Sequence, residues 1–281
     1  MQTPKDLTAG YGTLLVHAEP GAASTERVEA AAQLARDLGA RLIGLGAETF
    51  EPYPTPDPFS GYAAGEWVVL IQDQISKNLT AAEAAFRRDA AGADSEWRSA
   101  QDYPHDALAR NACAADLIVV SGRQAESRTR SADAADVVMN AGRPVLIVPE
   151  GRRTLQADTV VVAWKNTREC RRAVADARPF LAGAKVVIVL GVSKPDAAEA
   201  VSAEVSDVVA NLRRHGVEAR GQVEPQGSGV VTETIQSVAD AAGADLIVCG
   251  AYGHSRLREW VFGGVTDDLI HRPGRFILMS H

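Results

Sequence analysis

The chain has 281 residues, of which 46% are hydrophobic and 23% charged, and its formal net charge is −7. This composition is typical of a globular protein with sizeable cores, and the negative charge argues against a nucleic-acid binder, which needs a basic face. No apolar run approaches the ~18 residues of a membrane span, and no apolar signal-peptide stretch follows the first residues, so we expect a cytoplasmic protein of about two domains.

The sequence repeats itself once. Three segments of the first half recur in the same order in the second half, and this order predicts two copies of one unit. Residues 13–18, 115–122 and 142–149 correspond to residues 159–164, 244–251 and 274–281. We expect one domain over residues 1–150 and another over residues 151–281, joined by a short polar stretch at residues 150–153 that has little reason to fold on its own.

The first copy contains an insertion that the second copy lacks. Residues 51–65 carry four prolines, and we predict an irregular surface flap or contact segment there. The prolines are Pro52, Pro54, Pro56 and Pro58.

The second copy alternates short apolar runs with helical patterns. The apolar runs predict strands, several of them β-branched and buried on both faces, at residues 159–164, 185–190, 217–223, 246–249 and 276–279. Helical patterns lie between them at residues 167–181, 196–215 and 230–242. Thr167 can cap the first of these helices, and Glu169 adds a favourable charge to its first turn.

This alternation predicts the fold class. Strands that alternate with helices form a parallel, doubly wound sheet with right-handed crossovers. We therefore expect two five-stranded parallel α/β domains that pack as a pseudo-dimer. The candidate contact strands are residues 145–148 and 276–279, whose exposed backbone groups would be covered by pairing.

One loop carries the sharpest chemical signal. Ligands of open α/β sheets bind at the carboxyl ends of strands, near the point where the strand order reverses. The loop that leaves the strand at 246–249 has glycines spaced as Gly-x2-Gly-x9-Gly, and a helix is predicted to begin at 265–266. Glycines let the backbone turn its amides toward a ligand, and a helix N-terminus favours an anion. The pattern predicts a triphosphate cradle, although the Gly-Lys-Ser/Thr ending of a Walker loop is missing.

The loop resembles that of universal stress protein domains, whose nucleotide-binding members carry Gly-x2-Gly-x9-Gly-Ser/Thr after the fourth strand. Gly250, Gly253 and Gly263 match this pattern. The resemblance covers the whole chain as a tandem, with the second copy the closer match, and implies an adenine-nucleotide α-hydrolase-like fold. It also implies that ATP or another adenine nucleotide binds to the second domain. The residues that would bind it are Cys249, Gly250, Gly253, His254, Ser255, Gly263, Gly264, Val265 and Thr266 in the loop, Ala163, Trp164 and Lys165 after the first strand, and Val192 at the end of the second.

Two positions depart from the family pattern. Gly264 takes the place of a serine or threonine, which removes a hydroxyl donor to phosphate. Lys165 takes the place of an aspartate that helps to hold the adenosine. A lysine has no acceptor for ribose hydroxyls, although it could reach a phosphate as a point charge.

The first copy departs further. Its equivalent loop is shorter and lacks the spaced glycines, and Asp133 and Asp136 near the expected phosphate position would repel a polyanion. We therefore expect no nucleotide in the first copy. His17 and Glu19 look like loop-end residues for which the sequence indicates no partner.

The resemblance implies a stress-response regulator or binding module rather than a fast enzyme. The sequence indicates no catalytic residue around the loop and no metal site, and it leaves Mg²⁺ unassigned. Cys113, Cys170 and Cys249 are expected to be buried thiols. Two other functions stay open: an interaction protein of the same fold without a nucleotide, and an enzyme that uses ATP, at most a slow ATPase. We expect an unidentified protein partner, no nucleic acid and no membrane, and a homodimer of tandem chains stays open.

Overall fold

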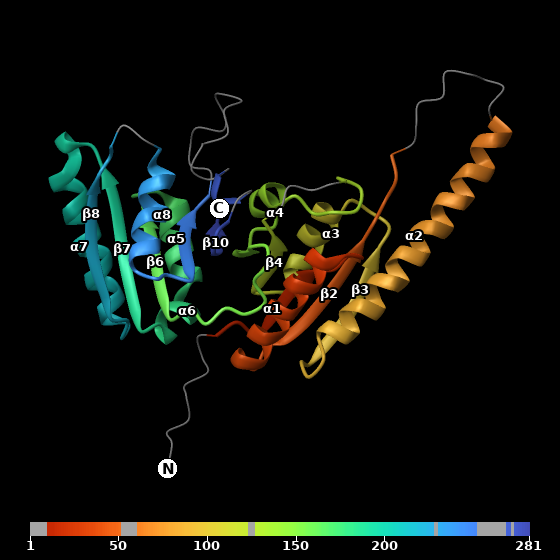
Figure 1. Cartoon of the computed structure of the whole chain (residues 1–281), viewed down its shortest axis with the longest axis horizontal. Coiled ribbons are helices and arrows are strands. Elements are labelled where there is room, and N and C mark those ends of the chain that lie inside the picture. Colours follow the sequence, from red (N-terminus) through yellow and green to blue (C-terminus); the bar gives the residue numbers. More distant parts are fainter. Residues whose placement is uncertain (1–9, 52–60, 123–126, 228–229, 252–267, 271–272) are drawn as a thin grey trace, which may run out of the picture.

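The computed structural model of the chain describes residues 10–51, 61–122, 127–227, 230–251, 268–270 and 273–281. These residues form one ten-stranded sheet with the order β3-β2-β1-β4-β5-β10-β9-β6-β7-β8, which runs across the molecule in Figure 1. The strands are β1 (Thr13–His17), β2 (Arg41–Ala47), β3 (Ser95–Ala100), β4 (Leu117–Ser121), β5 (Val145–Val148), β6 (Thr159–Trp164), β7 (Val186–Ser193), β8 (Ala219–Pro225), β9 (Leu246–Gly250) and β10 (Phe276–Ser280).

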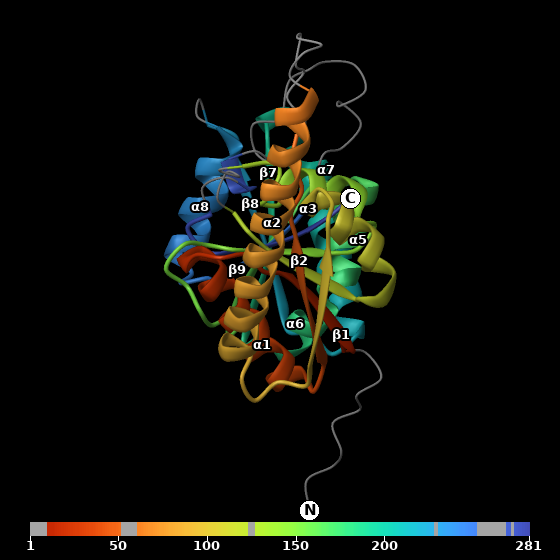
Figure 2. The ribbon, with the colours of Figure 1, turned by 90° about the vertical axis from the view of Figure 1, so that its right-hand side faces the viewer.

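Helices cover both faces of the sheet. One buried cluster includes side chains of α1, α2, α5, α6 and α7, and the other includes side chains of α3, α4 and α8; Figure 2 shows α5 and α8 on opposite sides of the sheet. Among the described residues, no helix is long and apolar enough to cross a bilayer. The helices are α1 (Ala22–Leu38), α2 (Gly61–Asp89), α3 (Pro104–Asn111), α4 (Ala134–Asn140), α5 (Arg168–Asp176), α6 (Arg178–Gly183), α7 (Ala198–Arg214) and α8 (Val231–Ala241), with 3-10 turns η3 (Ala112–Ala114) and η4 (Pro195–Ala197).

The two halves of the sheet join through β5 and β10. Within each half every strand pair is parallel, whereas β5 and β10 pair in the antiparallel sense, with Leu146 opposite Leu278. The predicted doubly wound α/β fold is confirmed, and so is the pairing of these two strands. Because the pairing continues the backbone ladder, the two five-stranded halves form one continuous sheet.

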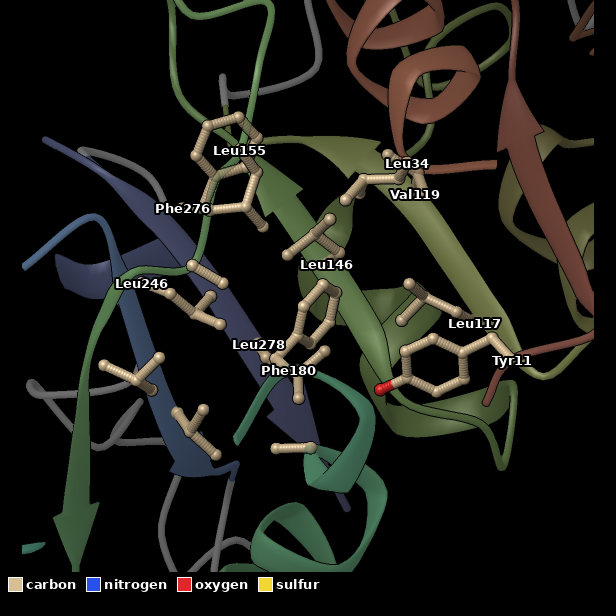
Figure 3. Packing of buried hydrophobic residues seen from close by; sticks show 14 of the residues in the cluster. Tyr11, Leu34, Leu117, Val119, Leu146, Leu155, Phe180, Leu246, Phe276 and Leu278 are labelled. Carbon is tan, nitrogen blue, oxygen red and sulfur yellow. The ribbon is translucent and has the colours of Figure 1, made fainter. Parts of the chain in front are cut away.

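The hydrophobic core also crosses this join. Leu146 of β5, Leu278 of β10 and Phe180 of α6 belong to one buried cluster and lie close together in Figure 3. The ring of Tyr11, which precedes β1, lies 5.6 Å from that of Phe180, and its hydroxyl donates to the carbonyl of Asp176 at 2.5 Å. The halves therefore share apolar packing as well as backbone hydrogen bonds.

The segment between β5 and β6, which includes the polar stretch 150–153 expected not to fold on its own, is held by contacts with α1. Leu155 is buried in the core, and its amide donates to the Gln33 side chain at 3.1 Å. Nearby, Arg153 pairs with Glu29 at 2.9 Å. The precise domain boundary near residue 150 stays a prediction.

Two expected elements and one cysteine need correction. The helix predicted over 167–181 is two helices, because Pro179, which lacks a backbone N–H, cannot continue α5 and lies instead in the first turn of α6, which begins at Arg178. The predicted cap is confirmed, since the Thr167 hydroxyl accepts from the Cys170 amide at 3.3 Å. The flap predicted over 51–65 is wrong for its last residues, because α2 begins at Gly61, while residues 52–60 lie outside the described part. Cys113 is exposed, whereas Cys170 and Cys249 are buried as expected.

Gly122, at the end of β4, forms a close contact between the halves. A β-carbon at this position would overlap the ring of Pro273 and would lie 2.7 Å from the carbonyl oxygen of Ile270. Ile270 and Pro273 belong to the C-terminal half. Only a glycine therefore lets the segment before β10 approach the carboxyl end of the N-terminal half's sheet.

We predict that Gly122→Ala destabilises the chain by about 1–3 kcal/mol, because the added methyl overpacks this contact. Urea unfolding followed by circular dichroism measures the change. Gly183→Ala is the matched control, since a β-carbon there meets nothing within 4 Å. Equal stability of the two variants would show that the contact is loose enough to accept a side chain.

Candidate functional site

The predicted site residues that the structure describes lie at one edge of the sheet. Ala163 and Trp164 end β6, Val192 is near the end of β7, and Cys249 and Gly250 end β9. These strands are neighbours in the order β9-β6-β7, and the strand order reverses at β6. The carboxyl ends of the strands therefore meet where open α/β sheets bind their ligands.

Gly250 is required by the approach of α5 to β9. A β-carbon at Gly250 would lie 2.5 Å from the backbone nitrogen of Cys170, in the first turn of α5. The first glycine of the motif therefore has a packing role that does not depend on a ligand.

The Cys170 thiol connects the two loops that flank the site. It donates to the carbonyl of Ala163 at 3.2 Å, and its sulfur accepts from the amides of Lys165 and Gly250. Burial raises the pKa of this thiol, while the two amides oppose the rise. Burial, followed by proximity to Cys170, also raises the pKa of Cys249. Both thiols therefore remain protonated and serve in packing.

The two faces of the sheet divide the predicted residues. Ala163, Val192 and Cys249 pack with the cluster on the α8 face, whereas Trp164 packs with the cluster on the opposite face. Lys165 follows β6 directly and is exposed. The structure thus brings Ala163, Val192 and Cys249 together and places the Trp164 ring elsewhere.

The central part of the motif lies outside the described residues. This part contains Gly253, His254, Ser255, Gly263, Gly264, Val265 and Thr266. Residues 268–270, which follow it, are helical, as expected for the helix that was predicted to begin near 265.

Sequence analysis missed polar groups that the structure leaves without partners. Five buried side-chain atoms of the described residues form no hydrogen bond, and four of them belong to the carboxyl-end region of the C-terminal half. These four are Trp164 Nε1, Glu169 Oε2, Ser193 Oγ and Thr232 Oγ1. A buried polar group without a partner costs about 1–3 kcal/mol. The Trp164 ring and α5, which carries Glu169, lie on the face of the sheet opposite Ala163 and Val192, whereas Thr232 belongs to the helix α8 on the same face as those two residues. The fifth unpaired atom, His17 Nε2, lies at the end of β1 in the N-terminal half.

Thr232 faces the predicted site. It is 2% exposed and shares the buried stripe of α8 with Ile235 and Ala239. That stripe packs against strand residues of the same cluster as Ala163 and Val192. As Thr232 lies in the first turn of α8, its hydroxyl lies at the end of the stripe nearest the carboxyl ends of β6 and β7.

In the N-terminal half the ends of β1 and β4 are bridged by Arg27. Its side chain on α1 is buried and donates to the carbonyl of His17 at 2.7 Å and to the hydroxyl of Ser121 at 2.6 Å. It also pairs with Glu19 at 3.3 Å, whose carboxylate accepts from the hydroxyl of Ser131 at 2.6 Å. His17 and Glu19 therefore have a partner, contrary to the sequence-based expectation.

Hydrogen bonds hold the loop after β4 to the residues that follow β2. Arg130 donates to the buried carboxylate of Glu48 at 3.1 Å, and the Thr49 amide donates to the carbonyl of Thr129 at 2.9 Å. Asp133 caps α4 by accepting from the amide of Ala135 at 2.8 Å. The protein's own carboxylate thus occupies the anion position at this helix N-terminus.

Burial shapes the ionisation of the cluster around Arg27. Burial, and then the charge of Arg27, lowers the pKa of His17 to about 4 despite the opposing effect of Glu19. Burial by itself raises the pKa of Glu19, but His17, Arg27 and Ser131 together bring it below its ordinary value. At neutral pH the cluster is a neutral imidazole beside an ion pair.

Comparison with known proteins identifies the C-terminal half. Residues 156–273 match the model of the universal stress protein family. No curated protein matches the sequence. Within the described residues, no group of three or more His, Cys, Asp or Glu side chains could hold a metal ion.

Solved structures resemble the whole chain. A universal stress protein from Archaeoglobus fulgidus has a TM-score of 0.67 at 14% identity, covering 96% of this chain and 98% of its own. A protein of unknown function from Pseudomonas aeruginosa has a TM-score of 0.56 at 15% identity, covering 98% and 93%. A universal stress protein in complex with cAMP covers 50% of this chain and 97% of its own, at 26% identity and a TM-score of 0.37. The two full-length matches show that the fold is shared from end to end.

We predict that stability falls as the pH is lowered from about 6.5 to 4 and that His17 is responsible for part of the fall. The pKa of His17 is about 4 in the folded chain against an ordinary value of 6.5, so in this interval the unfolded chain binds a proton that the folded chain does not. At about 1.36 kcal/mol per pKa unit the loss is about 3 kcal/mol.

Urea unfolding at pH 7 and pH 4.5 measures this loss for the parent, for His17→Asn and for the exposed control His215→Asn. His17→Asn should have a weaker pH dependence than the parent, and His215→Asn should retain the parent's. A pH dependence that is the same in all three proteins would contradict the prediction.

Proposed function

We propose that the chain, whose residues 156–273 match the universal stress protein family model and whose two halves share one fold, binds one adenine nucleotide at the carboxyl edge of β9, β6 and β7. We also propose that the chain acts as a stress-response regulator or binding module that responds to the nucleotide. Ala163 and Val192 would contact the adenosine, and the loop that begins at Gly250 would hold the phosphates.

The contrast between equivalent positions of the two halves carries this proposal. When β1 and β6 are aligned, Arg27 corresponds to Ala173 and Glu19 to Lys165. The N-terminal half fills the strand ends with its buried Arg27–Glu19 pair. The C-terminal half has only a methyl group at Ala173, and the buried hydroxyl of Thr232 on α8 forms no hydrogen bond. An external ligand is therefore expected in the C-terminal half alone.

The chemistry of the C-terminal edge favours binding over catalysis. The buried thiols of Cys170 and Cys249 have raised pKa values, so neither is an activated nucleophile. The Glu169 carboxylate is paired with Arg168 at 2.5 Å. These groups support a protein that holds a nucleotide and reports its presence rather than one that turns it over quickly.

We predict one nucleotide per chain. Equilibrium dialysis of the full chain against ATP should reach a stoichiometry of one, because Arg27 and its partners fill the N-terminal position and Asp133 takes the anion position on α4. Two equivalent sites would contradict the assignment of the N-terminal half as closed. If the full chain binds no ATP at all, the proposed function itself is contradicted.

We also predict that backbone amides of the glycine loop supply most of the affinity for phosphate. Amide donors to a phosphate contribute roughly 1.5–3 kcal/mol each, so Gly253→Val, which hinders the approach of the backbone, should weaken ATP binding about a hundredfold or more. Lys165→Ala should change ATP affinity less, since an exposed lysine contributes about 1 kcal/mol at most. Gly264→Ser should strengthen binding modestly by adding a hydroxyl donor.

Calorimetric titration of ATP into the three folded variants checks this order. The prediction is contradicted if Gly253→Val binds ATP as tightly as the parent and Lys165→Ala does not bind ATP. That result would mean that a side-chain charge rather than the backbone holds the phosphates.

A further inference from the structure

A lysine follows each of the two strands β6 and β7 at the proposed site. Lys165 follows β6 and Lys194 follows β7, and both side chains are exposed. Of the carboxylates near these lysines, Glu169 pairs through Oε1 with Arg168, Glu204 accepts from Asn166 at 3.0 Å, and Asp196 lies in η4, two residues after Lys194. The side chains that follow these two strands therefore offer positive charge to a ligand.

The N-terminus of α8 adds free backbone donors to the same edge. Val230 is the N-cap of this 11-residue helix and gives no side-chain cap. The first-turn amides of a helix have no partners within the helix, and together with the helix dipole they favour an anion. Val231, in this first turn, packs against the same buried cluster as Val192 and Ala163.

Thr232 is an independent indication that this helix N-terminus meets a ligand. Its hydroxyl is buried without a hydrogen-bond partner and lies on the sheet-facing stripe of α8, toward the ends of β6 and β7. A hydroxyl in this position can donate to a ligand beside Val192. Donors of three kinds, an ammonium group, helix amides and a hydroxyl, thus surround the sugar end of the proposed nucleotide.

These donors would decide whether the site accepts a ribose with free hydroxyls or a ribose that carries a phosphate. In dinucleotide-binding folds a carboxylate about 20 residues after the first turn holds the free ribose hydroxyls, whereas a cation nearby accommodates a ribose phosphate. The first side chain after β6 is Lys165 and the first after β7 is Lys194, so neither strand end presents a carboxylate there. The N-terminal half has a carboxylate, Glu19, at the position of Lys165.

We propose that the C-terminal site binds an adenine nucleotide whose ribose carries a phosphate at the 2′ or 3′ oxygen in addition to its 5′ phosphate. Lys165, the α8 N-terminus and Thr232 bind the ribose phosphate. This inference rests on the proposed function and names the ligand class of that same site.

Calorimetric titration of the full chain tests it with 5′-AMP, ADP and the two adenosine bisphosphates, 2′,5′ and 3′,5′. At least one bisphosphate should bind about tenfold or more tightly than 5′-AMP, because a charge-assisted hydrogen bond contributes about 1.5–3 kcal/mol. ADP carries its second phosphate at the other end of the nucleotide, so it controls for charge alone.

The variants assign the effect to residues. Lys165→Ala and the near-isosteric Thr232→Val should each reduce the preference for the bisphosphate over 5′-AMP several-fold and leave the ratio of ADP to 5′-AMP unchanged. Lys185→Ala is the matched control, because Lys185 precedes β7 at the opposite end of the strands and pairs with Asp158 at 2.7 Å. It should retain the preference of the parent.

The outcomes separate this inference from the proposed function. If 5′-AMP and ADP bind but neither bisphosphate binds more tightly than 5′-AMP, the inference is wrong and the proposed function stands. If none of the four ligands binds, the inference is wrong, and titration with ATP then decides the proposed function separately. If the preference exists but survives in Lys165→Ala and Thr232→Val, the assignment to these residues is overturned.

Discussion

The antiparallel pairing of β5 with β10 is the constraint on which the rest of the structure depends. Each half, taken alone, would end in an exposed strand edge, which favours aggregation or pairing with another chain. Pairing the two edges covers both and makes the core continuous through Leu146 and Leu278. It also brings Gly122 of one half against Ile270 and Pro273 of the other. Two repeats thereby form one body in which the half-sites lie on a shared sheet.

Within this common frame the two halves differ in what occupies the strand ends. In the N-terminal half, Arg27 and Glu19 form a buried pair whose hydrogen bonds extend to Ser121 and Ser131. A buried ion pair is tolerated only when its remaining polar atoms are satisfied, and this network satisfies most of them. In the C-terminal half the corresponding positions are Ala173 and Lys165, so no such internal pair forms there. The proposed asymmetry follows from this difference: the N-terminal half carries its own ion pair at the strand ends, whereas the C-terminal half is proposed to bind a nucleotide there.

The sequence predicted the fold well because the strands are short apolar runs whose repetition is visible along the chain. It also identified β5 and β10 as the contact strands. The sequence did not predict the features that depend on contacts between residues far apart in the chain. Arg27 reaches Ser121, 94 residues away, and nothing near either residue indicates that contact. Thr232 reads as an ordinary residue of an amphipathic helix, and only the packing of α8 shows that its hydroxyl faces the strand ends.

The position of a bound nucleotide tests the central claim most directly. Irradiation of the full chain with 8-azido-ATP, followed by mass spectrometry of the peptides, locates the adenine. The account predicts labels on peptides that contain the ends of β6 and β7 or the start of α8, and predicts that unlabelled ATP competes for them. Labels on peptides around Glu19, Arg27 and Ser131 that unlabelled ATP removes would contradict the account, because they would place the nucleotide in the half whose strand ends carry the buried Arg27–Glu19 pair.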